Sequence, residues 1–306
     1  KLQHRETRRK RITSYLVSNG FYETYHLSFV KEAENLLLDP HQSGVKVMNP
    51  LSAELEFMRT STLIGGLKSV AHNLNRQQND VKLFKWGSIF NLEEENIVEK
   101  KTLSFWMTGN NNESNWHTNA SKSDFFFAKA FVENAMKLGN TKNYTTEAFS
   151  GNSIYAYGLN YISKGEIVAT VGLVSKNILK ETDIAQEVFF GEIDAKFLLE
   201  SGKTETQYSA ISKFPKVERD LSLVVPQQVN YGQIRETVNK LNSRLIKKFY
   251  IFDVYQGEQV KEGFKSYAIR LEFEDKSKTL EDKTIDKLMQ SLSSSLETDL
   301  NVEIRK

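Results

Sequence analysis

The sequence predicts a two-domain α+β protein whose sheets are largely antiparallel. With 306 residues the chain is longer than a typical small domain and suits two. Strand-like segments outnumber helical ones, and they do not alternate regularly with helices, which disfavours a parallel sheet. Residues 201–212 are polar and weakly patterned. We therefore expect this segment to link two domains, over residues 1–208 and 213–306.

The chain opens with a predicted helix and then a strand. Ile12, Tyr15 and Leu16 have the spacing of one helix face within Arg5–Ser18, and Gly20 stands where a C-terminal cap belongs. Phe21–Val30 has the composition of a strand. The basic run at residues 8–11 is either an RNA-binding patch or, as we favour, a solvated helix face or partner surface.

The rest of the first domain is predicted to be mostly strands. Asp124–Leu138 is a helix ended by Gly139. An earlier helix, started by Thr60 or Ser61 as cap, turns Leu63, Leu67, Val70 and Leu74 inward. The strand-like segments are Val81–Phe90, Leu103–Met107, Ile154–Ile162, Ile167–Val174 and Val188–Ile193.

The second domain has the clearest pattern. Asn230 and Gln233 form a capping-box-like helix start. The predicted elements are a strand at Leu221–Val225, a helix with Ile234, Val238 and Leu241 inward, strands at Ile246–Tyr255 and Lys265–Glu274, a helix capped by Thr279 with Ile285, Leu288, Leu292 and Leu296 inward, and a strand at Val302–Ile304. This βαββαβ order is that of a ferredoxin-like fold, with helices on one face of the sheet and the other face open.

Composition excludes several kinds of protein. No cysteine is present, so disulfides and thiolate chemistry are excluded, which fits a reducing cytosol. A formal net charge of +2 is too small for binding of nucleic acid by bulk phosphate neutralisation. No apolar run has the length of a membrane span, and no signal peptide opens the chain. Because the first residue is Lys1, we expect a portion of a longer protein.

Familiar catalytic motifs are missing. Neither common glycine-rich phosphate loop occurs, and the five histidines are scattered without metal-ligand spacing. The carboxylates at residues 93–95 fit a solvated turn better than an acid/base pair. We therefore expect no metal site and no catalytic residue.

A series of short motifs resembles the β chain of bacterial phenylalanyl-tRNA synthetase. The motifs cover nearly the whole chain in the right order. Each motif alone is weak evidence, but together they are highly specific for this family. The motifs are residues 47–52 (VMNPLS), 58–61 (MRTS), 83–90 (LFKWGSIF), 213–215 (KFP), 219–222 (RDLS), 252–257 (FDVYQG), 265–266 (KS) and 279–282 (TLED).

The resemblance implies that the first domain has the fold of a class II synthetase catalytic domain without its activity. A working site needs an arginine within F-R-x-E, but the matching stretch Phe90-Asn91-Leu92-Glu93 has an amide there. It also needs an arginine at a glycine-rich helix start, and the nearest dipeptide, Glu218-Arg219, follows no glycines. We expect no cofactor in this portion, whereas the whole enzyme of this family uses ATP and magnesium.

The resemblance also implies partners. The family assembles as an α₂β₂ tetramer in the cytoplasm, and Arg5–Phe29 falls where class II enzymes carry their dimerisation element. We therefore expect this surface to pack against the catalytic α subunit; alternatively, the helix only covers its own sheet. The family's editing and oligonucleotide-binding-like regions lie upstream of such a portion, so we expect no misacylated-tRNA hydrolysis here.

The family's terminal domain binds the anticodon of tRNA, which requires aromatic rings and hydrogen-bond donors on the open sheet face. Tyr255, beside Gly257, is the expected stacking residue, and Ser266 the expected hydrogen-bonding one. Further candidates are Arg219, Lys265, Arg270 and Lys213. In the alternative interpretation, Arg219 pairs with Asp220 to hold the strand, and Tyr255 is half in the core.

Two other functions compete with a tRNA-binding and partner-binding β-chain portion. One is an independent class II ligase with a displaced active site. The other is a regulatory module, because ferredoxin-like domains also bind effectors and proteins.

Overall fold

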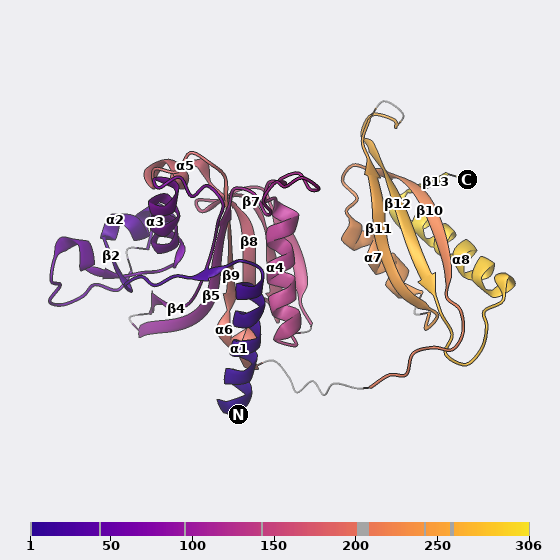
Figure 1. Cartoon of the computed structure of the whole chain (residues 1–306), viewed down its shortest axis with the longest axis horizontal. Coiled ribbons are helices and arrows are strands. Elements are labelled where there is room, and N and C mark those ends of the chain that lie inside the picture. The colour runs from indigo at the N-terminus through magenta and orange to yellow at the C-terminus, as the bar shows by residue number, and fades with distance from the viewer. Residues whose placement is uncertain are drawn as a thin grey trace. The chain divides into compact units, whose positions relative to one another are not determined.

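The computed structural model describes residues 2–42, 44–94, 96–141, 143–200, 208–241, 243–257 and 260–305, with side chains from residue 4. Most of the predicted linker, residues 201–207, lies outside the described residues. The chain divides into two compact units, Lys1–Glu205 and Thr206–Lys306 (Figure 1). None of the described helices is long and apolar enough to cross a membrane.

The first unit is built on a seven-stranded sheet in the order β1-β4-β5-β9-β8-β7-β6. All neighbours are antiparallel except β1 and β4. The strands are β1 (Tyr22–Glu23), β4 (Val81–Glu93), β5 (Asn96–Thr108), β6 (Thr145–Phe149), β7 (Tyr155–Ser163), β8 (Glu166–Val174) and β9 (Val188–Asp194). A separate pair joins β2 (Phe29–Val30) to β3 (Phe57–Met58), next to the 3₁₀ turn η1 (Ala53–Leu55).

Helices cover both faces of this sheet (Figure 1). The first face packs against α1 (Leu2–Ser18), α4 (Phe125–Leu138) and α6 (Ala195–Glu200) through rings such as Phe105 and Phe131. The second face packs against α2 (Glu32–Leu38), α3 (Leu63–Leu74) and α5 (Lys176–Glu181). Trp106 and Phe190 fill that second face, and a Cβ on Gly66 of α3 would lie 2.0 Å from the Trp106 ring.

Several sequence predictions for this unit are confirmed. Gly20 ends α1 with φ +83°; its N–H donates to Val17 O and that of Phe21 to Leu16 O, which is a Schellman cap. Gly139 is the C-cap of α4. The five predicted strands are all present, although β4 and β5 form a longer hairpin than predicted.

Two predictions were wrong. Phe21–Val30 is not one strand, because Tyr22 and Glu23 pair with β4 whereas Phe29 and Val30 pair with β3. The N-cap of α3 is Thr62, not Thr60 or Ser61. The Thr62 hydroxyl makes no cap bond, because it donates into the buried interior, while Ser61 Oγ accepts from Leu63 N at 3.1 Å.

The second unit is the predicted βαββαβ fold, with sheet order β11-β12-β10-β13. Helices α7 and α8 pack together over one face, which leaves an open face (Figure 1). The elements are β10 (Val217–Pro226), α7 (Tyr231–Lys240), β11 (Ile246–Tyr255), β12 (Phe264–Phe273), α8 (Asp282–Leu300) and β13 (Glu303–Arg305).

The first turn of α7 is capped by a neighbouring side chain, whereas that of α8 is not. Asn230 and Gln233 make both bonds of the predicted capping box of α7. The predicted cap Thr279 was wrong, because α8 begins at Asp282 with Glu281 as N-cap and no side-chain cap bond. Asp282 instead pairs with Arg219 of β10 at 2.7 Å, so a tertiary contact marks this helix start.

Candidate nucleic-acid interface

The open face is carried by alternate residues of β12 and their register partners. Ser266, Ala268, Arg270 and Glu272 point to this side, whereas Tyr267, Ile269, Leu271 and Phe273 are buried under the helices, as the alternation predicts. The partners on β11 are Tyr255, Asp253, Tyr250 and Lys248; those on β10 are Val224, Ser222, Asp220 and Glu218. This register places Tyr255 beside Ser266, the two residues expected to read an RNA base.

Tyr255 ends the edge strand and is 40% exposed. Its ring lies against Gly257, where an added Cβ would be 2.5 Å from the Tyr255 hydroxyl. The absence of a Cβ at Gly257 therefore makes room for the Tyr255 ring. A tyrosine so placed offers both a ring face and a hydroxyl to a ligand.

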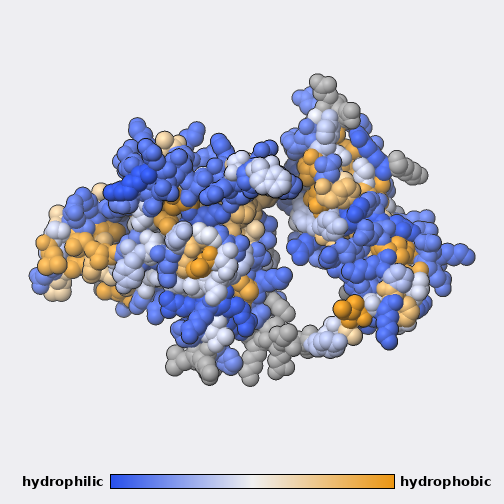
Figure 2. Space-filling model, in the orientation of Figure 1, coloured by the Kyte–Doolittle hydropathy of each residue, from blue (hydrophilic) through white to orange (hydrophobic). Residues whose placement is uncertain are grey.

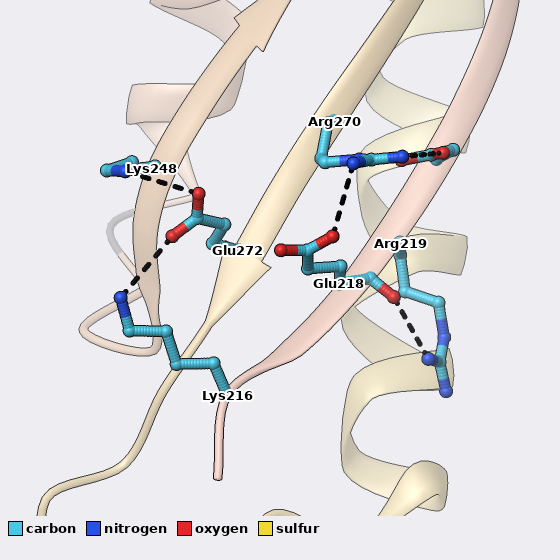
Figure 3. A network of polar contacts seen from close by, with 7 residues as sticks. Lys216, Glu218, Arg219, Lys248, Arg270 and Glu272 are labelled. Atoms are coloured by element: carbon cyan, nitrogen blue, oxygen red, sulfur yellow. Dashed lines mark hydrogen bonds and ion pairs between the residues drawn. The ribbon is translucent and has the colours of Figure 1, made fainter. Parts of the chain in front are cut away.

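Arg270 lies on the open face but is already paired (Figure 3). Its Nε and Nη2 donate to the two carboxylate oxygens of Asp220 at 2.7 and 2.8 Å, and Nη1 lies 3.3 Å from Glu218. These bonds lower the pKa of Asp220 and raise that of Arg270, to which Tyr250 adds another side-chain hydrogen bond. The arginine is therefore fixed in orientation and its charge is compensated.

A second polar group lies at the end of the face where β12 finishes (Figure 3). The nearly buried Glu272 carboxylate is 3.3 Å from Lys248 Nζ and 3.6 Å from Lys216 Nζ. Both lysine side chains are more than half exposed. Two cations share one anion here, so this end of the sheet keeps positive charge at the surface.

The other predicted tRNA-binding residues lie elsewhere. Arg219 donates to Glu218 O at 3.1 Å (Figure 3) and pairs with Asp282 at the start of α8, so the alternative of an Arg219–Asp220 pair was wrong. Lys265 is 9% exposed on the helix side, and its ammonium donates to Gln227 O at 2.9 Å. Lys213 is exposed in the segment before β10. A role of these three residues in RNA binding stays a prediction.

Two aromatic residues on the open face, Tyr250 and Phe252, are not among the residues predicted from the sequence. A register shift between Ile251 and Asp253 inserts Phe252 as an extra residue, and the Arg270 guanidinium carbon lies 5.1 Å from its ring centroid. A regular strand would place residues 250 and 252 on one face, and the sequence does show that spacing. The bulge that shifts the register is not visible in the sequence.

In the first unit, a polar row crosses the second face of the sheet. Lys85, Ser104, Glu192, Thr170 and Asn160 are register partners across β4, β5, β9, β8 and β7. Glu192 accepts from Ser104 at 3.1 Å and from Thr62 at 3.2 Å, and burial raises the pKa of its carboxyl group.

Two cations, Lys85 in this row and Arg59 near it, are buried and bonded to the protein itself. Arg59 donates to Ser88 O at 2.8 Å and to Leu27 O at 3.0 Å, while Lys85 Nζ lies 3.4 Å from His26 O. Burial lowers the pKa of both cations. A Cβ on Gly87 would lie 3.0 Å from Arg59 Nη2 and 3.2 Å from Lys85 Cε, so the glycine makes room for both.

The structure also shows where the two stretches lie that were compared with the arginine motifs of class II catalytic sites. Asn91 lies near the end of β4 and accepts a hydrogen bond from Gln42 at 3.2 Å. Glu218-Arg219 lies in β10 of the second unit, outside the class II-like sheet. Among the described residues, no cluster of three His, Cys, Asp or Glu side chains could hold a metal ion.

Two family models match the chain in succession. The phenylalanyl-tRNA synthetase β chain CLM domain matches residues 1–195, and the ferredoxin-fold anticodon-binding domain matches residues 212–305. A class II-like domain followed by an anticodon-binding domain defines a component of a class II aminoacyl-tRNA synthetase. The chain belongs to the phenylalanyl-tRNA synthetase β-chain family.

Curated relatives agree with this assignment. The phenylalanine–tRNA ligase β subunit of Bacteroides fragilis is 34% identical over an alignment of 308 positions, which covers 96% of this chain and 38% of the relative. That of Syntrophotalea carbinolica is 31% identical, covering 97% of the chain and 38% of the relative. The chain thus spans less than two-fifths of the length of these relatives. Pyrrolysyl-tRNA synthetase from Desulfitobacterium hafniense superposes with a TM-score of 0.48 at 11% identity, covering 64% of this chain and 68% of that one.

Proposed function

We propose that the chain is the C-terminal part of a phenylalanine–tRNA ligase β subunit and binds the anticodon region of tRNA(Phe) through the open face of its second unit. The observation that carries this proposal is the pairing of Tyr255 with Ser266 in register on that face. A half-exposed ring supplies stacking, and an adjacent hydroxyl supplies a donor and acceptor for a base edge.

The charge of the face supports selective rather than general RNA binding. Arg270 is compensated by Asp220 and Glu218, and Glu272 takes up part of the charge of Lys216 and Lys248. Phosphate neutralisation therefore contributes little, and affinity depends on stacking and base contacts. We expect modest affinity when this chain acts without the rest of the enzyme.

Binding of tRNA with the phenylalanine anticodon, compared with an anticodon-swapped tRNA, tests this function. Tyr255→Ala should weaken binding about tenfold or more, because stacking on one base is worth roughly 1–3 kcal/mol. Tyr208→Ala is the matched control, since Tyr208 is 93% exposed and lies before the sheet. Salt-sensitive binding that ignores both the anticodon and Tyr255 would contradict the assignment.

We further propose that the first unit packs against the catalytic α subunit of an α₂β₂ enzyme. The segment from β1 to β2 exposes Tyr22, Tyr25 and Leu27, and the neighbouring loop exposes Met48 and Leu51. Figure 2 shows hydrophobic side chains gathered at the end of this unit that carries α2 and β2. Such an exposed apolar surface is typical of protein interfaces. Tyr25→Asp should reduce co-purification with α, whereas Trp116→Asp, on a different exposed loop, should not.

We propose that this part of the β subunit is non-catalytic and cytoplasmic, and that ATP and magnesium act at the α subunit. Two buried cations support this, because Arg59 and Lys85 donate to backbone carbonyls rather than toward a ligand. ATP–pyrophosphate exchange by the isolated chain separates this proposal from an independent ligase. A phenylalanine-dependent signal would favour the ligase.

A further inference from the structure

The edge strand β11 exposes more aromatic surface than one base requires. Tyr250, Phe252 and Tyr255 are 37%, 50% and 40% exposed on a strand whose outer edge has no described partner. Natural edge strands usually carry charge or proline there, because exposed apolar edges promote aggregation. Tyr255 accounts for one of these rings. The two others need a separate explanation.

The ring at the bulge and an anchored arginine together form a second aromatic platform. Phe252 is half-exposed and stands at the bulge as an extra residue outside the regular ladder, on the same face as Tyr250. Arg270 lies over this ring at 5.1 Å and is held there by Asp220 and Glu218. An Arg guanidinium stacked on an aromatic ring is a preorganised planar surface, since its side-chain entropy is already lost.

This platform is too far from Tyr255 to serve the same base. Arg270 and Ser266 are four residues apart on β12, about 13 Å at the usual rise of a strand, and each sits opposite its own β11 tyrosine. Beyond the platform in the same direction lie Lys248 and Lys216, two exposed cations around one carboxylate. Rings followed by positive charge along one strand suit a single-stranded nucleic acid that crosses the face.

We propose that Phe252 and Arg270 form a second base-stacking site, which takes an unpaired base of the bound RNA other than the one at Tyr255. Asp220, Glu218 and Tyr250 engage most of the Arg270 donors within the protein, so this site recognises the flat face of a base more than its edge. It therefore contributes affinity without distinguishing the four bases. The proposal rests on RNA binding by this face, as proposed above, and adds a second contact to it.

The test uses the full 306-residue chain and anticodon stem-loop RNAs with matched and swapped anticodons. Phe252→Leu keeps an apolar side chain but removes the ring, and should weaken binding of both RNAs by the same factor, about tenfold. Phe252→Tyr should bind like wild type. Val254→Ala is the matched control, because Val254 is 51% exposed on the same strand but is the partner of Tyr267, whose side chain is buried under the helices.

A base-level readout separates the two sites. With 2-aminopurine placed in turn at each loop nucleotide, Phe252→Leu should relieve fluorescence quenching at a different nucleotide from Tyr255→Ala. Unchanged binding by Phe252→Leu, together with loss in Tyr255→Ala, would overturn the second site and leave the proposed function standing. Failure of the wild-type chain to bind any of these RNAs would overturn the proposed function and the second site with it.

Discussion

The two units each contain a network of charged side chains, and the networks differ in burial. In the first unit Arg59 and Lys85 are 4% and 5% exposed, and they donate to backbone carbonyls beside the polar row. On the open face of the second unit, the side chains of Arg270 and Lys248 are 33% and 64% exposed and pair with carboxylates. Arginine and lysine side chains are therefore shielded from water in the first unit and exposed to water on the open face of the second.

This contrast separates charges that hold the fold from charges that can meet a ligand. A buried cation has given up its water, so losing its partners costs the full desolvation free energy. An exposed ion pair exchanges readily with water and contributes little to folding. Arg59 and Lys85 of the class II-like unit thus stabilise their own backbone, whereas Arg270 and Lys248 on the open face of the ferredoxin-like unit remain at the surface.

Removing the buried arginine should have the largest effect on stability. Arg59→Met leaves Ser88 O and Leu27 O without their donor and removes the positive charge near Glu192, so we expect a loss of about 3–5 kcal/mol in the first unit. Urea denaturation monitored by tryptophan fluorescence measures this loss, since all three tryptophans belong to the first unit. Arg76→Met, at the exposed end of α3, is the control and should change little. A loss of unfolding free energy no larger than that of Arg76→Met would show that the buried arginine does not stabilise the fold more than an exposed one does.

The buried network should also make stability depend on pH. Burial, then Lys85 and Arg59, lower the pKa of His26 from its ordinary 6.5 to about 4. The folded state therefore keeps His26 neutral while the unfolded state takes up a proton below pH 6.5. Stability is full above pH 6.5 and is lost as the pH falls toward 4, by roughly 1–2 kcal/mol once screening by solvent is allowed for.

Urea midpoints from pH 7 to pH 4 measure this effect against His26→Leu. Carboxylates titrate in both proteins, so the difference between the two pH profiles isolates the histidine. We expect the variant to lose less stability across this window than the wild type does. Parallel profiles would show that His26 is protonated in the folded state as readily as in the unfolded chain.

Breaking the exposed network should have the smallest effect on folding. Asp220→Asn removes a charge partner of Arg270 at the surface, and we expect a denaturation midpoint close to that of the wild type. RNA binding should weaken, because Arg270 is no longer held over Phe252. A large loss of stability with unchanged RNA binding would mean that the open face serves folding instead of recognition.

Much of the fold follows from local sequence patterns. The alternation along residues 265–274 predicted which side of β12 is buried, and the Asn230–Gln233 capping box predicted the start of α7. The failures fall where a distant segment decides the outcome. Thr62 stands at the N-cap of α3, but its hydroxyl bonds to the distant Ser104 and Glu192 instead of capping the helix. Phe21–Val30 is divided because β4 and β3 each pair with part of it.

The candidate site shows the same division. Sequence resemblance indicated Tyr255 and Ser266, and the strand register places them side by side. It also indicated Arg219, Lys265 and Arg270, but their partners, Asp282, Gln227 O and Asp220, lie 38 to 63 residues away in the chain. Because these partners are distant in the chain, the sequence near each cation does not show whether the cation is paired within the protein.

By itself the sequence determined the two-domain α+β plan, the βαββαβ order and the family, because periodicity, caps and short motifs are local properties of the chain. Only the tertiary structure decided which charges are buried, which arginine faces the open sheet, and where a bulge shifts the register of β11. Burial and pairing depend on residues far apart in sequence that the fold brings within a few ångströms. Desolvation then decides whether a charge supports the fold or stays available to a ligand.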